Sequence, residues 1–424
     1  MRILFVAPPF SGHLNCLIPL AKTACTEGHE CLFFTGPSKA AALAAQGFAV
    51  LIPHSIPADA MERIANWPRQ TSQQVGEMIA QFRGNLRLLG PLSAEIRGVL
   101  EAERPDVVVA DFTAVVVAKW CETLVVPWIT TIPTPLAIET RRGIPTYLGG
   151  WLPRAGLIGR LRDAAGRAAV RGFKKAVFAS HSRLIRPLLP RLYRGDGSEA
   201  IYSDQKILGF GLVELEFNHD WPASFEMIGP LYGALEDAPP LALQPAPKHI
   251  LASLGTHLEW AKDRFVQDIT RIAQAFPDWN FVITLGRPER ASDPACQVTR
   301  NVVVTPFVPY QRDLSRFDIV VHHGGAGIAY ATICAGLPSL VVPHDYDHFD
   351  YAARIQFHGL GLRVARLSDP AVPRLLSRLA EPEAWPNVTK FAIAARRYHP
   401  EERFLAALAD VTEDKNGGYR LFRT

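Results

Sequence analysis

Two parts of the 424-residue chain carry side chains whose types and spacing could do chemistry. The first is a pair, His13 and Asp111, each of which comes soon after an apolar run. Imidazole and carboxylate groups hold and move protons near neutral pH, so this pair is a candidate for catalysis. The second part is the sequence His-His-Gly-Gly-Ala-Gly at 322–327. Its glycines and polar groups are typical of a site for an anion.

The anion site depends on the elements around 322–327. The β-branched run 318–321 predicts a buried strand, and 328–335 favours a helix. Three glycines at this junction let the backbone adopt positive φ and approach a ligand, while the free N–H groups and the positive dipole end of the helix face the same point. The arrangement suits a phosphate or diphosphate, although a tight turn with packing glycines would use the same residues.

The N-terminal half begins with predicted strands and helices in the order βαβαβ. Its strands are continuously apolar, which is typical of a parallel sheet covered on both faces. Ligands bind at the carboxyl ends of such strands, so we expect His13 and Asp111 to face one crevice. The predicted strands are 2–7, 30–35, 49–52 and 106–110, and the predicted helices are 14–27, 40–46 and 71–100.

The second half repeats this alternation after a Pro/Ala-rich stretch that has the composition of a linker. Two Rossmann-like halves predict an α/β fold with a cleft between them, where two ligands could meet. The predicted division is an N-terminal domain at 1–236, a linker at 237–247, a C-terminal domain at 248–390, and a last helix with a tail at 391–424 that could pack back on the N-terminal domain. The predicted strands are 250–254, 281–285, 302–306 and 318–321, and the predicted helices are 261–275, 310–315, 328–335 and 389–410.

Composition and charge exclude several classes of protein. With 48% hydrophobic and 20% charged residues, the chain can bury a large core. It has no apolar run long enough for a transmembrane helix and no signal peptide at its start, so we expect a cytoplasmic protein. The net charge of +4 is too small to indicate nucleic acid. The six cysteines lack ligand or disulfide spacing, which predicts buried free thiols and no structural metal.

The segment 154–194 differs from the rest of the chain because it holds eleven Lys or Arg residues and a single acid, Asp163. The cations alternate with Leu, Ile, Val and Phe at roughly helical spacing. Such a segment is typical of peripheral contact with an anionic membrane, of a wall of an amphipathic substrate pocket, and of a solvated helix face. The sequence leaves these three interpretations open.

Several landmarks, taken in order, resemble the nucleotide-sugar-dependent glycosyltransferases of the GT-B fold, in particular the UDP-glycosyltransferase-like group that acts on small lipophilic acceptors. The most specific is His-x-Gly-x-Gly at 323–327, followed by Gly-x-Pro at 336–338, Pro343 and the loop 347–352. Ser-Gly-His-Leu at 11–14, Ser-Leu-Gly-Thr at 253–256 and Phe-Val-Pro at 307–309 extend the resemblance over most of the chain. It implies two Rossmann-like domains whose parallel sheets face each other across a cleft.

The resemblance also implies an inverting transfer of a sugar from a nucleotide diphosphate to a hydroxyl, as in natural product biosynthesis. His13 would be the general base and Asp111 its partner carboxylate, with no metal and no cofactor beyond the donor. His323 and the N–H groups after it would hold the diphosphate. Phe307 would stack on the nucleobase, and Asp347 would bond the sugar. The implied donor-binding residues are Gly12, Ser253, Gly255, Thr256, Phe307, Val308 through its backbone, His323, Gly325, Ala326, Gly327, Asp347 and His348.

Three positions depart from the family pattern. Eight residues after the motif histidine, where many members carry a Glu that bonds the ribose hydroxyls, this chain has Ala331. A donor without the ribose 2′-hydroxyl, such as a dTDP-sugar, would not miss that carboxylate, so UDP and dTDP both stay open. His348 and Tyr351 replace a Gln and an Asn of the sugar-binding loop, so glucose, galactose and deoxy sugars stay open too.

The acceptor is defined only in class. Apolar loops of the N-terminal domain should line its pocket, which predicts a lipophilic hydroxyl compound larger than a simple sugar. The candidate lining residues are Phe10, Trp67, Phe82, Phe112, Trp128, Ile144 and Trp151. No feature of the sequence indicates the oligomeric state.

Other functions would use some of the same features. A nucleotide-sugar epimerase of this fold would need further carboxylates in the cleft and no acceptor pocket. A non-catalytic sugar-nucleotide binder would keep its role without His13. A metal-dependent hydrolase could use a dense set of polar side chains, although the glycine turn suits diphosphate better. That set is His322, His323, His344, Asp345, Asp347 and His348.

Overall fold

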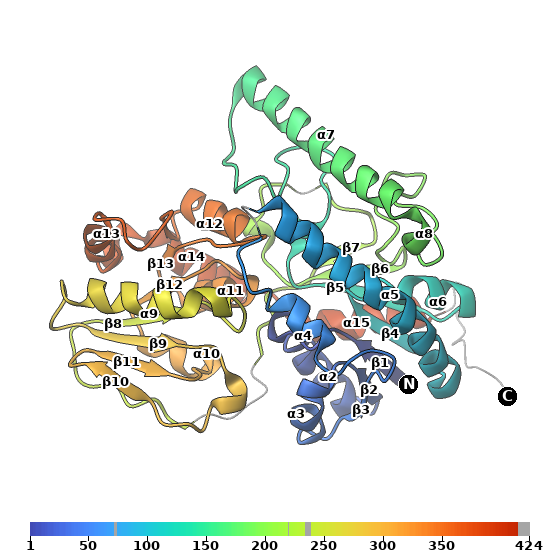
Figure 1. The fold of residues 1–424 in the computed structure, drawn as a ribbon, viewed down its shortest axis with the longest axis horizontal. Coiled ribbons are helices and arrows are strands. Elements are labelled where there is room, and N and C mark those ends of the chain that lie inside the picture. Colours follow the sequence, from blue (N-terminus) through green and yellow to red (C-terminus); the bar gives the residue numbers. More distant parts are fainter. Residues whose placement is uncertain (72–73, 219, 234–238, 414–424) are drawn as a thin grey trace.

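The computed structural model describes residues 1–71, 74–218, 220–233 and 239–413. Within these ranges the chain forms two seven-stranded sheets with helices packed around them (Figure 1), which confirms the predicted α/β class. The predicted linker at 237–247 and tail at 391–424 fall partly outside the described residues, which include neither 237–238 nor 414–424. The division into domains therefore stays a prediction.

The first sheet has the strand order β3-β2-β1-β4-β5-β6-β7, and all of its pairs are parallel. Its central strands are buried over almost their whole length, because helices cover both faces of the sheet. The strands are β1 (Arg2–Val6), β2 (Glu30–Phe34), β3 (Ala49–Leu51), β4 (Val107–Asp111), β5 (Trp128–Ile132), β6 (Lys206–Gly209) and β7 (Phe225–Met227).

The second sheet has the order β10-β11-β9-β8-β12-β13-β14. All pairs are parallel except β10 with β11, which is antiparallel and forms an exposed edge. A parallel sheet carrying one antiparallel edge strand is common in α/β folds. The strands are β8 (His249–Ser253), β9 (Asn280–Thr284), β10 (Cys296–Thr299), β11 (Val302–Thr305), β12 (Ile319–His322), β13 (Ser339–Val341) and β14 (Gly361–Arg363).

Helices connect most of the parallel strands. In the first half they are α1 (Ser11–Leu14), α2 (Leu17–Thr26), α3 (Ala40–Ala44), α4 (Ala60–Ala65), α5 (Val75–Glu103), α6 (Val117–Leu124), α7 (Gly156–Ser180) and α8 (Ser182–Ile185). In the second half they are α9 (Glu259–Ala273), α10 (Tyr310–Asp313), α11 (Ala326–Ala335), α12 (His348–Phe357), α13 (Val372–Leu379), α14 (Pro386–Ala395) and α15 (Pro400–Thr412). None of those described has the length and hydropathy needed to span a bilayer.

The predicted single helix at 389–410 is wrong, because the chain forms two helices there. α14 ends at Ala395 and α15 begins at Pro400. The residue before a proline avoids the helical region, and His399 has φ −122° and ψ 75°. The break lets the end of the chain change direction between the two halves.

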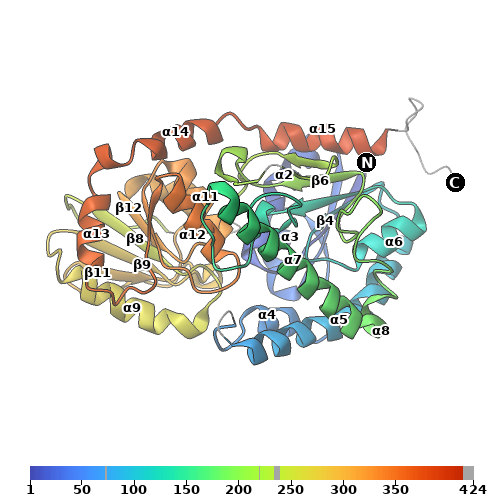
Figure 2. The same cartoon turned by 90° about the horizontal axis from the view of Figure 1, so that it is seen from above.

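The two ends of the described chain pack together. α14 lies beside α11 of the second half, and α15 packs on α2 of the first half (Figure 2). The Phe404 ring of α15 lies 6.1 Å from the ring of Phe5 in β1, and both side chains are buried in one cluster. The last helix therefore ties the second half to the first sheet.

A shared core joins the two halves near the cleft. Leu136, Leu212 and Leu215 come before residue 237, yet they are buried in the same cluster as Tyr330 of α11. This packing fixes the carboxyl ends of both sets of strands close to each other.

The cysteines are all free, but the prediction that they are buried holds for only three of them, Cys16, Cys31 and Cys121. Cys25 and Cys296 are exposed, and Cys334 is half-buried. Cys25 lies near the end of α2, and Cys296 lies on the edge strand β10. An apolar sequence context does not distinguish such peripheral positions from the core.

Candidate active site

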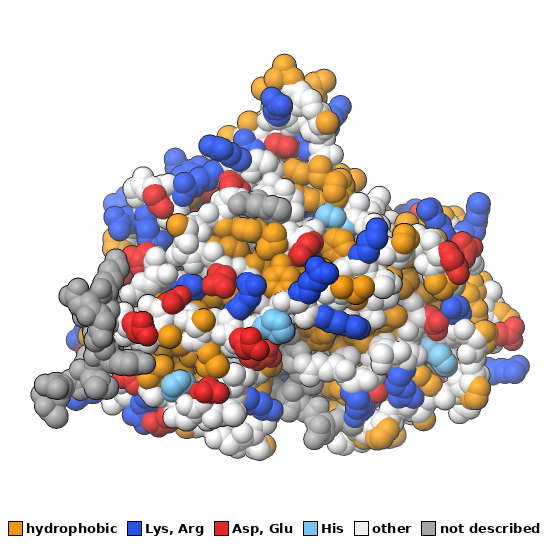
Figure 3. All heavy atoms as spheres, turned by 180° about the vertical axis from the view of Figure 1, so that it is seen from behind, with side chains coloured by type: hydrophobic (Ala, Val, Ile, Leu, Met, Phe, Trp, Pro, Cys, Tyr) orange, Lys and Arg blue, Asp and Glu red, His pale blue; other side chains and the backbone are white. Residues whose placement is uncertain are grey.

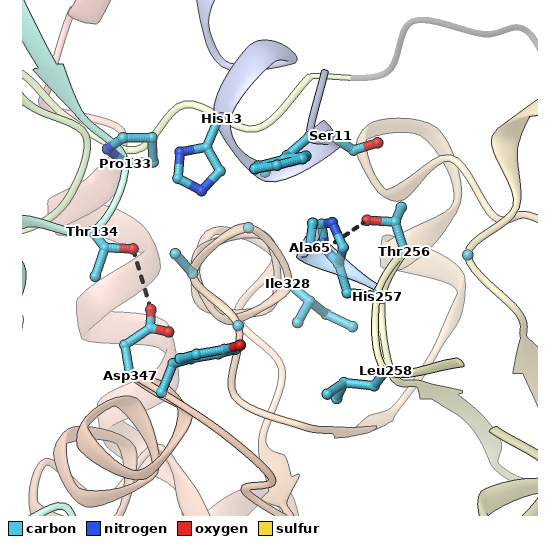
Figure 4. Close-up of a pocket in the computed structure, with 18 of the residues that line it drawn as sticks. Ser11, His13, Ala65, Pro133, Thr134, Thr256, His257, Leu258, Ile328 and Asp347 are labelled. Atoms are coloured by element: carbon cyan, nitrogen blue, oxygen red, sulfur yellow. Dashed lines mark hydrogen bonds between the residues drawn. The ribbon is translucent and has the colours of Figure 1, made fainter. Parts of the chain in front are cut away.

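A cavity of about 510 Å³ lies where loops of the two halves meet, and both halves supply its walls (Figure 4). The loops follow the carboxyl ends of strands in each sheet, which is where open parallel sheets bind ligands. The predicted residues that line the cavity are Phe10, Gly12, His13, Trp67, Phe112, Gly255, Thr256, Phe307, His323, Gly325, Ala326, Gly327, Asp347 and His348.

His13 and Asp111 form a hydrogen-bonded pair on one wall. His13 lies in α1 just after β1, and Asp111 ends the neighbouring strand β4. His13 Nδ1 lies 3.1 Å from both carboxylate oxygens of Asp111. The Asp111 side chain is fully buried and accepts a further hydrogen bond from the backbone N–H of Thr113 at 2.9 Å. Because the carboxylate holds the proton on Nδ1, Nε2 of the neutral ring is free to accept another.

The surroundings of His13 tune its proton affinity. Burial disfavours the charged imidazolium, but the charge and hydrogen bond of Asp111 outweigh burial and raise the pKa of His13 above its ordinary value. The ring of Phe112 stacks on the imidazole at 5.6 Å, and Phe10 meets it edge-on at 5.9 Å. These contacts orient a ring whose side chain is still 25% exposed to the cavity.

The glycine turn uses its three glycines in different ways. Only Gly324 has positive φ, at 96°, and a Cβ there would lie 2.8 Å from the carbonyl oxygen of His348. Gly325 has φ −65°, but its Cβ would lie 2.4 Å from Nε2 of His323. Gly327 is an ordinary position inside α11 with no atom near its missing Cβ. The expectation that all three supply positive φ is therefore wrong.

The N-terminus of α11 opens into the cavity. The helix begins at Ala326, and no side chain of the described residues caps it. Ala326, Gly327 and Ile328 all line the cavity, so the first N–H groups and the positive end of the helix dipole are available there. This is the geometry of an anion site.

Two neutral imidazoles lie beside this helix end. His323 and His348 meet edge to face with ring centroids 4.6 Å apart. Burial is the main cause that lowers both pKa values, that of His323 well below its usual range and that of His348 to about 3. The backbone N–H of Asp345 donates to His348 Nδ1 at 3.0 Å, which places the ring proton on Nε2. His348 is thus an uncharged hydrogen-bond donor.

Asp347 faces the first half of the chain across the cavity. Thr134, which follows β5, donates a hydrogen bond through Oγ1 to Asp347 Oδ2 at 3.2 Å (Figure 4). Burial raises the pKa of Asp347, although hydrogen bonds from its own backbone N–H and from Thr134 act in the opposite direction. A half-buried carboxylate at this point can accept hydrogen bonds from hydroxyl groups of a ligand.

Two predicted donor-site residues do not line the cavity with their side chains. Ser253 is buried, and its Oγ lies 2.9 Å from the Tyr310 hydroxyl and accepts the Gly255 N–H at 3.1 Å. Ser253 therefore stabilises the turn from its buried side and does not contact the cavity. The Val308 side chain lies in a core cluster with Leu251, and a contact between its backbone and a ligand stays a prediction.

Four predicted acceptor-site residues also lie elsewhere. Phe82 is one position from the cavity residue Gln81, so it points about 100° around α5 and packs against His181. Trp128 lies at the amino end of β5, far from the carboxyl ends that form the cavity. Ile144 is buried in a loop pinned by Asn218, and Trp151 packs under Arg162. Of the predicted set, Phe10, Trp67 and Phe112 line the cavity.

Several cavity residues were not predicted from the sequence. Thr134 and Tyr147 follow β5, a strand that was not predicted, and the position after a central strand was the available signal. His257 follows the Ser-x-Gly-Thr turn and meets Phe10 edge-on at 5.6 Å. Burial, with the charge of His13 as the next cause, lowers the pKa of His257 to about 4, so this ring is neutral at pH 7.

Two of the histidines considered as hydrolase ligands contact the backbone of the chain. His322 Nδ1 accepts the Gly324 N–H at 3.1 Å, and His344 Nδ1 lies 2.7 Å from the Val342 carbonyl oxygen. Within the described ranges, no three His, Cys, Asp or Glu side chains are grouped as they would be around a metal ion. The site favours a role for these imidazoles in shaping the turn and donating hydrogen bonds.

Parts of the chain are similar to known proteins. Residues 272–382 match the family described as "Erythromycin biosynthesis protein CIII-like, C-terminal domain". A zeaxanthin glucosyltransferase of Pseudescherichia vulneris is 32% identical over 145 residues, which cover 32% of this chain and 33% of that enzyme. A sterol 3-beta-glucosyltransferase of Saccharomyces cerevisiae is 34% identical over 92 residues, or 20% of this chain and 8% of that protein. The matches thus span a third or less of these curated relatives.

Solved structures extend the likeness to the whole chain. The glycotransferase of kitacinnamycin has a TM-score of 0.72 at 22% identity and covers 97% of this chain and 99% of its own. The Streptomyces sp. SF2575 glycosyltransferase SsfS6, complexed with thymidine diphosphate, has a TM-score of 0.64 at 18% identity and covers 96% and 99%. The predicted fold is confirmed: the chain has the GT-B fold of these glycosyltransferases.

Proposed function

We propose that this protein is an inverting glycosyltransferase that moves a sugar from a nucleotide diphosphate sugar to a hydroxyl group of a lipophilic small molecule. One observation carries the proposal: the His13–Asp111 pair lies on the wall of the same cavity into which the N-terminus of α11 opens. A general base and an anion site on one cavity meet the two demands of the reaction.

The chemistry follows from the side chains present. Nε2 of neutral His13 accepts the proton of the acceptor hydroxyl, whose oxygen attacks the anomeric carbon of the sugar. The bond from that carbon to the diphosphate oxygen breaks, and the electron pair leaves with the diphosphate. Asp111 stabilises the imidazolium that forms and keeps its orientation. A single displacement of this kind inverts the anomeric centre.

The leaving diphosphate needs a counter-charge or hydrogen-bond donors. The free N–H groups of Ala326, Gly327 and Ile328, with the dipole of α11, supply them. His348 adds a neutral N–H whose tautomer is fixed by the backbone of Asp345. We therefore propose that transfer does not depend on a metal ion, and that activity persists in the presence of a chelator.

We propose dTDP-sugars as the preferred donors. Ala331 packs among buried apolar residues such as Ile328 and Leu314, so no carboxylate stands at this position for a ribose 2′-hydroxyl. The related structures of SsfS6 and VinC were solved with thymidine diphosphate or dTDP, and they share the fold of this chain. Comparing the affinities of dTDP and UDP by calorimetry tests this preference.

The acceptor side supports a lipophilic compound. Phe10, Trp67 and Phe112 give the cavity aromatic walls near His13. The partial relatives are named for sterols and zeaxanthin, both lipophilic alcohols. We expect an acceptor of that class, with its hydroxyl directed at His13.

The central experiment is His13→Ala, with His54→Ala as the matched control because His54 is exposed and outside the cavity. We expect the first variant to lose transfer by at least about a hundredfold while its affinity for dTDP is unchanged, since the base acts only on the acceptor. The control should match wild type. Turnover of His13→Ala near the wild-type rate would refute the assignment. Conversion of the donor sugar in the absence of any acceptor would instead indicate an epimerase.

A further inference from the structure

The helix α7 differs from an ordinary surface helix in having no large apolar side chain among its fully buried positions. Its buried positions, Gly159, Asp163 and Gly166, are small or polar and face the body of the protein. A Cβ at Gly166 would lie 2.6 Å from Pro145 and 2.8 Å from Trp151, so this face packs closely on the loop 145–151. The half-buried positions of α7 carry both cations and apolar side chains, the latter being Val170, Val177 and Phe178. The inner face is therefore mixed, whereas surface helices normally bury an apolar face.

The outward face of α7 is apolar. Leu157, Ile158 and Leu161 are 70%, 66% and 62% exposed, and they lie within one turn of each other. Leu152, just before the helix, is 40% exposed. We call these four side chains the α7 tip. Further along the same face the exposed residues are mostly small or apolar, namely Ala164, Ala165, Ala168, Ala169, Gly172, Phe173 and Ala176.

The α7 tip projects from the molecule. Figure 1 shows the start of α7 at the end of a protrusion, away from both sheets. Figure 3 shows hydrophobic side chains at the summit of that protrusion, with Lys and Arg side chains beside them. Exposing apolar side chains to water is energetically unfavourable. A projecting apolar surface of this kind therefore indicates an interaction surface.

The cations of the segment fall into two groups. Those on the inner side are paired: Arg171 contacts Glu139 at 3.1 Å, and Lys174 contacts Glu199 at 2.6 Å. In contrast, Arg154, Arg160 and Lys175 are exposed, and no carboxylate of the described chain lies within ion-pair distance of them. The outer side thus combines apolar side chains with positive charges that are not neutralised within the protein.

We propose that the α7 tip and its flanking cations bind the surface of an anionic lipid bilayer, with α7 lying in the plane of the headgroups. Apolar side chains that enter the acyl boundary, next to cations that meet anionic headgroups, are the pattern of interfacial helices. The same face of a second copy is a poorer partner, since pairing two α7 helices would bring their cations together. The proposal holds whatever reaction the cavity performs.

Contact between α7 and a membrane would bring the cavity of the proposed transferase close to acceptors in the bilayer. The loop 145–151 that supports the inner face of α7 contains Tyr147, which lines the cavity. A lipophilic acceptor dissolved in the bilayer would meet the protein on this side. This last step rests on the proposed function, while bilayer binding does not, and separate assays measure the two.

Sedimentation with vesicles tests the proposal on the full chain. Vesicles of phosphatidylcholine alone are compared with vesicles in which a third of the lipid is phosphatidylglycerol. We expect binding to the anionic vesicles that weakens at high salt, because headgroup attraction is screened. Leu157→Ser/Ile158→Ser/Leu161→Ser should lower the partition coefficient by at least about a hundredfold through lost apolar burial. Arg154→Gln/Arg160→Gln/Lys175→Gln should lower it by about fivefold for each charge.

The matched control is Val298→Ser/Ile393→Ser, which removes exposed apolar side chains far from α7 in sequence. It should bind vesicles like wild type, and all variants should keep the wild-type melting temperature and the rate with a water-soluble acceptor. Absence of binding to anionic vesicles, or wild-type binding by the Leu157→Ser/Ile158→Ser/Leu161→Ser variant, would overturn the proposal. A wild-type dimer that this variant converts to a monomer would overturn it too, because the α7 tip would then be a contact between copies.

Discussion

Thr134 and Asp347 join the two halves of the chain at the cavity, with the Thr134 hydroxyl 3.2 Å from one carboxylate oxygen of Asp347. Thr134 follows β5 of the first sheet, while Asp347 is the residue before α12 in the second half. The sugar-binding carboxylate proposed for the second half is therefore held by the first. The position of this carboxylate therefore depends on how the two halves of the chain pack against each other.

This bridge predicts a graded loss of transfer. Thr134→Val removes one hydrogen bond to a carboxylate, which should lower kcat/KM by about tenfold. Asp347→Asn, which also removes the charge, should lower it further. Affinity for dTDP, which lacks the sugar, should not change in either variant. Thr134→Ser keeps the hydroxyl and serves as the control. A loss of dTDP affinity equal to the loss of kcat/KM would show that the bridge supports the nucleotide site instead.

The acid limb of the pH–rate profile should report His13. Transfer requires the neutral ring, so kcat/KM should fall as pH falls through a pKa above the ordinary value of 6.5, because Asp111 raises it. In Asp111→Asn the charge is gone and burial remains, which lowers the pKa of His13. We expect the acid limb to move to lower pH while the plateau falls by about a thousandfold, since the amide no longer fixes the tautomer or stabilises the imidazolium.

Measurement of kcat/KM from pH 5 to pH 9 checks this expectation, and the inverting stereochemistry of the product is recorded in the same reactions. An acid limb that keeps its position in Asp111→Asn would mean that another group controls it. His257 is the nearest alternative, but burial already lowers the pKa of that ring to about 4.

The sequence predicted what depends on local pattern. The strand before His323, the helix after Gly325 and the parallel sheets follow from β-branched runs and a glycine turn, and the structure has them. His13 and Asp111 were paired because each follows a strand of the predicted parallel sheet. The direction of those strands alone brings their carboxyl ends together.

What the sequence could not predict depends on side-chain direction and on contacts between the halves. Phe82 and Gln81 are neighbours in sequence, yet only Gln81 lines the cavity, because successive residues on a helix point about 100° apart. Thr134 meets Asp347 only because two separate sheets pack against each other. The exposure of apolar side chains on α7 also depends on which face meets the loop 145–151, and periodicity alone does not give that direction.

The buried carboxyl of Asp350 should make the free energy of unfolding depend on pH. Burial raises its pKa from 3.8 to about 6, although Arg354 and a hydrogen bond from the Tyr147 N–H act against burial. Because the folded state holds this proton more tightly than the unfolded state, the group's contribution is complete below pH 3.8 and is lost as the pH rises through 6. The loss amounts to about 3 kcal/mol for a shift of this size.

Asp350→Asn mimics the protonated carboxyl and still offers an oxygen to Tyr147. We expect the variant to match wild type in free energy of unfolding near pH 4 and to exceed it by about 2 to 3 kcal/mol near pH 8. Urea denaturation at both pH values measures the difference. If the difference in free energy of unfolding between the variant and wild type were the same at pH 4 and pH 8, the Asp350 carboxyl would not titrate between these two pH values.

Arg354 and Glu216 form a buried ion pair between the halves, with Nε and Nη2 of Arg354 at 3.0 and 2.8 Å from Glu216 Oε2 and both side chains only 3% exposed. Removing one partner leaves the other charge buried, so Arg354→Ala should cost about 3 to 5 kcal/mol in free energy of unfolding. Arg354→Met/Glu216→Leu removes both charges and keeps the apolar volume, so it should recover most of that loss. Urea denaturation of both variants separates the two effects. If the double variant were as unstable as Arg354→Ala, the loss would come from packing against Phe217, which the guanidinium covers at 4.6 Å, and not from the unpaired charge.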